Sequence, residues 1–157
     1  MTVDREHKAF VPTNRDYAKH VQESFDKQGL MKHLGATLMN VRAGYCEIGL
    51  PYREELSQQH GFFHAGGLTA IIDSAGGYAA FSLFEPDDGV LTVEFKINCI
   101  APALGERLIA RGEVVKAGRT LTITRGEVIA VKDGTETVCA LMQQTMMRVT
   151  GRAEVKG

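Results

Sequence analysis

The stretch HAGGLTAIIDSAGGYAAFSLF, residues 64–84, decides the fold of this chain. It predicts one long helix, because apolar side chains recur at helical spacing at Leu68, Ile71, Ile72, Ala75 and Ala79. The same stretch carries Gly66, Gly67, Gly76 and Gly77, and each glycine costs about 1 kcal/mol relative to alanine in an exposed helix interior. A helix with four glycines is expected to lie unusually close to another element or to a ligand.

The overall composition is that of one ordinary globular domain, apart from its glycine. The chain has 157 residues, which predicts a single domain over 1–157, and 17 of them are glycine, about 11% against a usual ~7%. Lys and Arg total 18 and Asp and Glu total 19, so the net charge is −1. No cationic stripe is present to displace phosphate counterions, which argues against a general nucleic-acid binder.

Cysteine, histidine and the apolar segments predict no metal and no membrane span. Cys46, Cys99 and Cys139 lie far apart and form no C-x-x-C pair, so we interpret them as three buried thiols in a reducing compartment. The five histidines have no metal-ligand spacing with a cysteine, and we expect no metal and no cofactor. The N-terminal residues do not resemble a signal peptide, and Asp73 interrupts the most apolar segment. We therefore expect a soluble, cytoplasmic protein.

On both sides of the long helix the sequence predicts shorter elements. A short amphipathic helix is expected over about 16–28, ended by Gly29, and a hairpin over 35–50 that turns at Ala43-Gly44. Four strands follow, at 90–100, 107–116, 119–131 and 136–149, and the tail 150–157 is expected to be frayed. The domain core is therefore expected to span about 35–149.

We interpret this order as an α+β domain, in which a curved antiparallel sheet has one face covered by the central helix. Because short turns join the last four strands, we expect them to pair as an antiparallel meander. In the strand 90–100, Val93 and Phe95 alternate with Thr92 and Glu94, which predicts that Thr92 points away from the apolar face. The side-chain phase changes across Gly126, and we expect a β-bulge there.

The segment from Gln58 to Tyr78 holds the residues most suited to chemistry. The first N–H groups of a helix have no intrahelical partner and the helix dipole adds to them, so Ala65, Gly66 and Gly67 are candidates for an oxyanion hole. Asp73 is a candidate base, although a lone aspartate in such a helix is ordinarily solvent-facing or a cap. His64 suits a helix start or packing better than a general base, and Gln58 is ordinarily a surface residue.

The two candidate features cannot serve one reacting atom within one straight helix. Asp73 lies nine residues beyond His64, at the start of the small-residue turn, a separation of about 13 Å at the ~1.5 Å rise of a helix. Either the two features are unrelated, or Asp73 is supplied by a second subunit. A two-fold dimer with neighbouring central helices would create two such sites.

Three motifs of the sequence, taken in their order along the chain, resemble those of a known family. The pattern Q-x-H-G-F-x-H-A-G-G-x-x-x-x-x-D-S-A-G-G-Y-A-A, from Gln58 to Ala80, resembles the PaaI-like acyl-CoA thioesterases of the hotdog-fold superfamily. T-V-E-F-K-I-N-x-x-x-P-A from Thr92 resembles the family's strand after the central helix, and A-R-G-E-V-V-K-A-G-R-T-L from Ala110 resembles its next hairpin. The resemblance covers roughly residues 35–148.

The resemblance implies a hotdog fold, in which the sheet wraps the central helix, and a homodimer joined edge to edge that often pairs again into a homotetramer. It implies that the Ala65 N–H supplies the oxyanion contact, although the family usually has glycine there. Asp73 matches the family's general base or nucleophile. Gln58 matches a position that orients water or the substrate carbonyl, Thr92 one that hydrogen-bonds the attacking water, and His64 the motif histidine.

Two functional hypotheses follow. The first is a thioesterase that hydrolyses acyl-CoA to a free acid and CoA, with Gly66, Gly67 and Gly77 leaving room for substrate. Arg119, together with Lys116 and Arg107, is then a candidate for the CoA phosphates, although scattered surface cations are common. The alternative is a non-catalytic acyl-CoA or acyl-carrier binding module on the same fold. The signature of a hotdog hydratase is not found.

Overall fold

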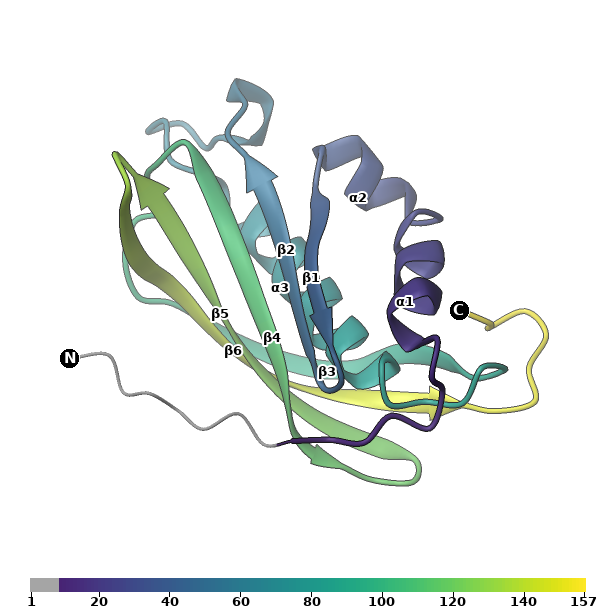
Figure 1. The fold of residues 1–157 in the computed structure, drawn as a ribbon. Coiled ribbons are helices and arrows are strands. Elements are labelled where there is room, and N and C mark those ends of the chain that lie inside the picture. Colours follow the sequence, from purple (N-terminus) through teal and green to yellow (C-terminus); the bar gives the residue numbers. More distant parts are fainter. Residues whose placement is uncertain (1–8) are drawn as a thin grey trace.

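The structure, a computed structural model, describes residues 9–157. Its elements are α1 (Tyr17–Phe25), α2 (Gly29–Leu34), β1 (Thr37–Arg42), β2 (Tyr45–Pro51), the 3₁₀ turn η1 (Glu54–Leu56), α3 (Ala65–Phe81), β3 (Gly89–Cys99), β4 (Arg107–Ala117), β5 (Leu121–Lys132) and β6 (Thr135–Val149). The six strands form one antiparallel sheet that curves around α3, as Figure 1 shows. The predicted α+β fold, a curved sheet with one face covered by a central helix, is confirmed.

The predicted meander of the last four strands is wrong in one respect. The strand order is β1-β2-β4-β5-β6-β3, so β3 pairs with β6 at the edge of the sheet and β4 pairs with β2. The connection over residues 100–106 is not a tight turn. Extended, it reaches about 23 Å, whereas passing the ends of β5 and β6 takes three strand spacings, about 14 Å. The connection is therefore long enough to carry the chain across the sheet.

Glycines set the close approach of α3 to the sheet. Gly112 on β4 and Gly126 on β5 are paired neighbours beneath the helix. A Cβ at Gly112 would lie 2.5 Å from the Ala75 carbonyl carbon, and a Cβ at Gly126 would lie 2.5 Å from Ile72 Cδ1. On the helix itself, a Cβ at Gly76 would collide with the side-chain oxygen of Gln144. Part of the glycine excess is therefore explained by backbone contact between helix and sheet.

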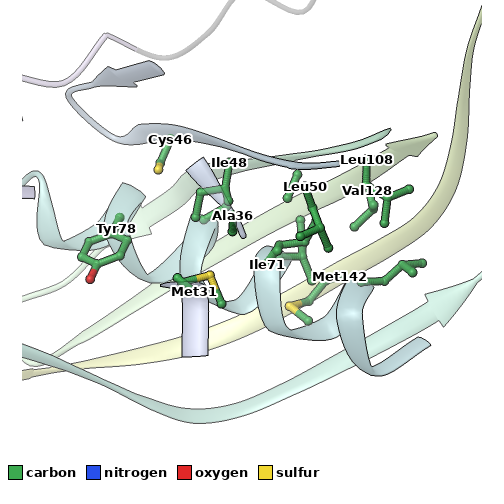
Figure 2. Close-up of a cluster of buried hydrophobic side chains, with 14 of the residues drawn as sticks. Met31, Ala36, Cys46, Ile48, Leu50, Ile71, Tyr78, Leu108, Val128 and Met142 are labelled. Atoms are coloured by element: carbon green, nitrogen blue, oxygen red, sulfur yellow. The ribbon is translucent and has the colours of Figure 1, made fainter. Parts of the chain in front are cut away.

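The core lies between α3 and the face of the sheet that the helix covers. Figure 2 shows its tightly packed side chains, which include Ile48 and Leu50 from β2, Leu108 from β4 and Ile71 from α3. All four of these side chains are fully buried. The opposite face of the sheet carries a much smaller apolar cluster of Ile109, Ile129 and Val131, with charged residues around it. Function is therefore to be sought where the covered face meets α3.

The N-terminal region contains two helices where the sequence predicts one. The helix expected over 16–28 ends at Phe25, and Gly29, expected to end it, begins α2 instead. Gly35 ends α2 in the left-handed conformation, with φ of 77°. Both helices are anchored by buried side chains, Val21 and Phe25 in α1 and Met31 and Leu34 in α2, so packing stabilises a six-residue helix that sequence periodicity does not reveal.

Two smaller expectations are corrected. Gly126 keeps its register with both neighbouring strands, and the irregularity lies between Val128 and Ile129, opposite Cys139 of β6. Cys46 and Cys139 are buried as predicted, but Cys99 is exposed, because it ends the edge strand β3. The predicted turn at Ala43-Gly44 is confirmed, and Asp133-Gly134 forms the turn between β5 and β6; both glycines have positive φ.

The segment 150–157, predicted to be frayed, contains no helix or strand but returns to the domain and ends beside α1 (Figure 1). Lys27 Nζ donates to the Gly157 carbonyl at 3.0 Å, and Lys156 pairs with Asp87 at 3.2 Å. This segment thereby lies against the end of α1 and the turn that follows α3. Over residues 9–157, no helix has the length and apolar character needed to cross a membrane.

Candidate active site

Asp73 lies in the middle of α3, half-buried, with one carboxylate oxygen firmly held. Thr92 Oγ1 donates to Asp73 Oδ1 at 2.7 Å, and Gln144 Nε2 donates to the same oxygen at 2.9 Å. Within residues 9–157 no group donates to the other oxygen, Oδ2. The carboxylate is therefore oriented through one oxygen, while the second is available to accept a proton or to attack a carbon.

A β-bulge places Thr92 on the helix side of the sheet. The register of β3 against β6 shifts between Thr92 and Glu94, which leaves Val93 as the extra residue. Thr92 is therefore opposite Met146 and on the same face as Phe95, not on the opposite face as strict alternation predicts. The shift corrects the predicted orientation, and it is what allows the Thr92 hydroxyl to reach Asp73.

Gln144 is a candidate functional residue that the sequence reasoning missed. It lies on β6, is 2% exposed, and donates to both the carboxylate and, at 3.4 Å, the backbone carbonyl of Asp73. The sequence does contain a signal for it. Gln144 stands in the same phase as Met142 and Met146, both buried, and a polar residue in the apolar phase of a strand needs a buried partner.

A cavity of about 280 Å³ opens beside Asp73. Its lining includes Asp73, Thr92 and Gly77, of the predicted site residues, and also Met146 and Tyr78. A larger hollow of about 1510 Å³ lies against the outer face of the sheet, where Arg111 pairs with Glu47 at 3.1 Å, but it contains none of the predicted site residues. The smaller cavity is therefore the one connected with the candidate chemistry.

The N-terminal end of α3 is capped by His64, as a helix-start role predicts. His64 Nδ1 accepts from the Gly66 N–H at 2.8 Å, and the His64 carbonyl accepts from the Gly67 N–H at 2.9 Å. Two of the three N–H groups proposed for an oxyanion hole are therefore already used. In the described part of the chain, the Ala65 N–H has no acceptor. Ala65 is exposed and is the first residue of the helix, so its N–H is free to bind an anion.

The remaining predicted residues lie away from Asp73. Gln58 is held in the loop before α3, where its side-chain oxygen accepts from the His60 N–H. It belongs to the same end of the helix as His64. Arg119 lies exposed in the connection between β4 and β5, as does its neighbour Thr120, and does not line the cavity of Asp73. Substrate contacts by Arg119, Gly66 and Gly67 remain predictions.

The structure keeps the two groups of site residues apart within one protomer. α3 is an unbroken helix of 17 residues, and eight residues separate Ala65 from Asp73, which is about 12 Å along its axis. A thioester-sized group cannot touch the Ala65 N–H and the Asp73 carboxylate of one chain at once. No group of three or more His, Cys, Asp or Glu side chains that could hold a metal is found among residues 9–157.

Comparisons with known proteins identify the family. The sequence model of the thioesterase superfamily matches residues 60–137, a range that includes Asp73 and Thr92. A solved thioesterase family protein from Silicibacter pomeroyi is 49% identical to this chain and superposes on it with a TM-score of 0.85. The match covers 86% of this chain and 99% of the Silicibacter protein. The chain belongs to the thioesterase superfamily.

Other relatives agree with this membership. A Saccharolobus solfataricus protein named as a candidate esterase is 31% identical over 113 residues, which cover 71% of this chain and 80% of that protein. The Escherichia coli PaaI protein of the phenylacetic acid degradation operon is 18% identical and shares the fold, with a TM-score of 0.77 over 87% of this chain and 95% of that one. The predicted PaaI-like hotdog thioesterase is confirmed as family and fold, and a thioester hydrolase in general is supported.

Proposed function

We propose that this thioesterase superfamily member hydrolyses acyl-CoA to a free acid and CoA at a site that two subunits share. The observation that carries the proposal is the Asp73 carboxylate, with Oδ1 held by Thr92 and Gln144 and Oδ2 left free at a cavity. A residue fixed in this way loses little orientational freedom on reaction, which is what a general base or nucleophile requires.

Asp73 Oδ2 acts in one of two ways. As a base, it accepts a proton from water while the water oxygen attacks the thioester carbonyl carbon; the C–S bond then breaks and the thiolate takes the proton. As a nucleophile, it attacks the carbonyl carbon itself and displaces the thiolate; water then hydrolyses the mixed anhydride to the free acid and the Asp73 carboxylic acid, whose proton goes to the thiolate. Both routes give one carboxylic acid and one CoA thiol for each thioester and each water.

The Ala65 N–H is the proposed oxyanion donor. It points from the first turn of a helix, where the macrodipole favours developing negative charge, and it has no acceptor in the described chain. Because Ala65 and Asp73 of one chain lie about 12 Å apart along α3, the donor must come from a second copy. We call the residues that each subunit contributes to one site a half-site. In this proposal Gln58 and His64 belong to the same half-site as Ala65, and His64 positions the start of the helix through its cap.

The free edge of β3 is where the second copy is proposed to join. β3 is eleven residues long and ends the sheet, and Leu91, Val93 and Phe95 are 45%, 55% and 44% exposed. A long apolar edge strand is a site for pairing with another chain. Thr92 lies on β3 and bonds Asp73, so both residues lie near this edge of the sheet. Antiparallel pairing of two β3 strands would place the sheet and the α3 helix of the second copy next to them. Such a dimer contains two identical composite sites.

The test is thiol release from a panel of acyl-CoAs by wild type and by Asp73→Asn. The variant keeps an oxygen that accepts from Thr92 and Gln144 but removes the charge, so we expect kcat to fall by about 10²–10⁴-fold. Asp16→Asn, at the exposed start of α1, where the side chain makes no cap hydrogen bond, is the matched control and should keep full activity. Light scattering should give a dimer or a multiple of it for all three proteins.

Two results would contradict the proposal. Full turnover by Asp73→Asn would remove Asp73 from the chemistry. Tight acyl-CoA binding by wild type without any thiol release would favour the binding-module hypothesis instead.

A further inference from the structure

A polar cluster lines the cavity beside Asp73 on the side away from Thr92. Gln28, in the linker between α1 and α2, donates through Nε2 to the Tyr78 hydroxyl at 2.8 Å. Ser74 Oγ donates to Gln28 Oε1 at 3.2 Å, and Ser24 Oγ lies 3.2 Å from the Tyr78 hydroxyl. All four side chains line the same cavity as the Asp73 carboxylate.

One wall of the cavity near Asp73 is apolar and narrow. Gly77, Val90 and Met146 form it, and a Cβ at Gly77 would lie only 3.3 Å from Met146 Cε. From Asp73 to Tyr78 along α3 is five residues, or about 7 Å. Lys27, Lys156 and Gly157 also line the cavity, and there Lys27 Nζ donates to the Gly157 carbonyl while Lys156 pairs with Asp87. Besides these lysines, the cavity presents a carboxylate, an apolar wall and a group of uncharged hydrogen-bonding side chains within the length of a short acyl group.

The polar side of the cavity is closed from behind. Ser74 and Tyr78 are only 9% and 3% exposed, and the Phe25 ring of α1 packs edge-on against the Tyr78 ring with centroids 6.1 Å apart. The pantetheine arm of CoA continues to a nucleotide that must reach solvent, whereas the acyl group is the end of the substrate. The buried wall that Ser74 and Tyr78 form therefore suits the acyl group, and about 280 Å³ lies at the low end of the volumes of small-molecule pockets.

The chemistry of the cluster favours a neutral polar partner. Burial raises the pKa of Tyr78, so its hydroxyl stays protonated at neutral pH. The Gln28 amide has a second N–H that donates to none of the described residues, and the serine hydroxyls retain acceptor capacity. Asp73 at the other side of the cavity is a carboxylate, and Lys27 and Lys156 are bonded to the Gly157 carbonyl and to Asp87, so an anionic acyl group would have to displace one of these partners. A methyl group against this cluster would displace water from polar atoms without replacing its hydrogen bonds.

We propose that this cavity is the acyl pocket and that Gln28, Ser74 and Tyr78 select short acyl groups with a hydroxyl or a similar neutral hydrogen-bonding group far from the thioester. The inference rests on the proposed function, because it names the acyl group for the same site. It makes these three residues determinants of specificity, since they contact the distal end of the substrate and not the reacting atoms.

The test compares heptanoyl-CoA with 6-hydroxyhexanoyl-CoA, which differ by one terminal methyl or hydroxyl group. The chain is flexible, so the terminal group can reach the cluster without a fixed geometry. We expect wild type to favour the hydroxylated substrate in kcat/KM by about five- to tenfold, the size of one net hydrogen bond. Gln28→Leu and Tyr78→Phe should each bring this ratio close to one, mainly through slower turnover of the hydroxylated substrate.

Gln22→Leu is the matched control, since Gln22 is exposed on α1 and bonds only Asp26 among the described residues; it should keep the wild-type ratio. Tyr78→Phe removes one atom and keeps the ring packing, so it remains informative if Gln28→Leu does not fold. A wild-type ratio of one or below would overturn the inference while leaving the thioesterase proposal standing. An equal rise of KM for both substrates in the variants would also overturn it, because the cluster would then contact pantetheine. Absence of thiol release from either substrate would count against the proposed function itself.

Discussion

The two half-sites of the proposed active site are held in place in different ways. The N-terminal end of α3 is held by its own neighbours in the sequence: His64 caps the helix two residues ahead of Gly66, and Gln58 lies in the loop just before it. The middle of α3 is held by distant strands, because Asp73 bonds Thr92 of β3 and Gln144 of β6, 19 and 71 residues away. One half-site is local in sequence and exposed, and the other depends on the whole sheet.

This difference explains why each half needs the other. An exposed N–H such as that of Ala65 stabilises an oxyanion weakly while water surrounds it, and strongly once a surface excludes the water. Asp73 already has a cavity and two positioning donors, but the Ala65 N–H of its own chain lies about 12 Å away along α3. In the proposed dimer, a second copy of the chain supplies each half with what it lacks.

The largest expected effect, after loss of Asp73, is on the exposed half. Ala65→Pro removes the backbone N–H that has no acceptor among residues 9–157 and should leave the helix intact, because proline is favoured at the first position of a helix. His64 already has the extended conformation that precedes proline, with φ of −67° and ψ of 140°. We expect kcat to fall by about 10²–10³-fold with an unchanged melting temperature.

Ala65→Gly keeps the N–H and is the control for that substitution; it should retain activity. Wild-type turnover by Ala65→Pro would show that the oxyanion is bound elsewhere. The N-terminal end of α3 would then not be a half-site of the active site.

An intermediate effect is expected in the buried half. Gln144→Met and Thr92→Val each remove one donor to Asp73 Oδ1 at nearly constant volume, so each should lower kcat about tenfold with little change in KM. Because both donors hold the same oxygen, the double variant should deviate from the product of the two single effects. Gln143→Met, next to Gln144 on the exposed face of β6, is the control and should behave as wild type. If the fold-losses in kcat of the two single variants simply multiply in the double variant, the two donors do not act on one carboxylate.

The smallest expected effect concerns the cap. His64→Ala removes the acceptor for the Gly66 N–H and should lower the free energy of unfolding by about 1 kcal/mol. His64→Asn restores a good capping side chain and should recover the stability. Thermal or urea unfolding measures both. If His64→Asn recovers stability but not kcat, the imidazole has a role in the reaction beyond holding the helix start.

The same contrast separates what the sequence can predict from what it cannot. α3, its capped start, the hairpin of β1 and β2 and the tight turns are specified by residues close in sequence, and those predictions are confirmed. The pairing of β3 with β6 depends on where residues 100–106 lead the chain, and the face of Thr92 depends on one extra residue at Val93. The alternation of apolar and polar residues along the strands predicts neither the pairing of β3 with β6 nor the face on which Thr92 lies.

Gln144 illustrates the same limit within the site. Its partner is 71 residues away, so no local pattern connects it with Asp73. What the sequence does show is a glutamine between two methionines in the buried phase of β6. A search for polar residues out of place in an apolar strand face would have found it. The helix α2 was missed for a similar reason, since its six residues are stabilised by Met31 and Leu34 in the core and not by periodicity.

The central claim, that one site takes Ala65 from one copy and Asp73 from another, is tested most directly by mixing two inactive variants. Ala65→Pro and Asp73→Asn are unfolded together in equal amounts and refolded, so that half of the dimers contain one chain of each. Each mixed dimer then has one site with both an intact Ala65 and an intact Asp73. We predict that thiol release recovers to about one quarter of the wild-type rate. Recovery no greater than the sum of the two separate variants, with mixed dimers shown to form, would contradict a shared site.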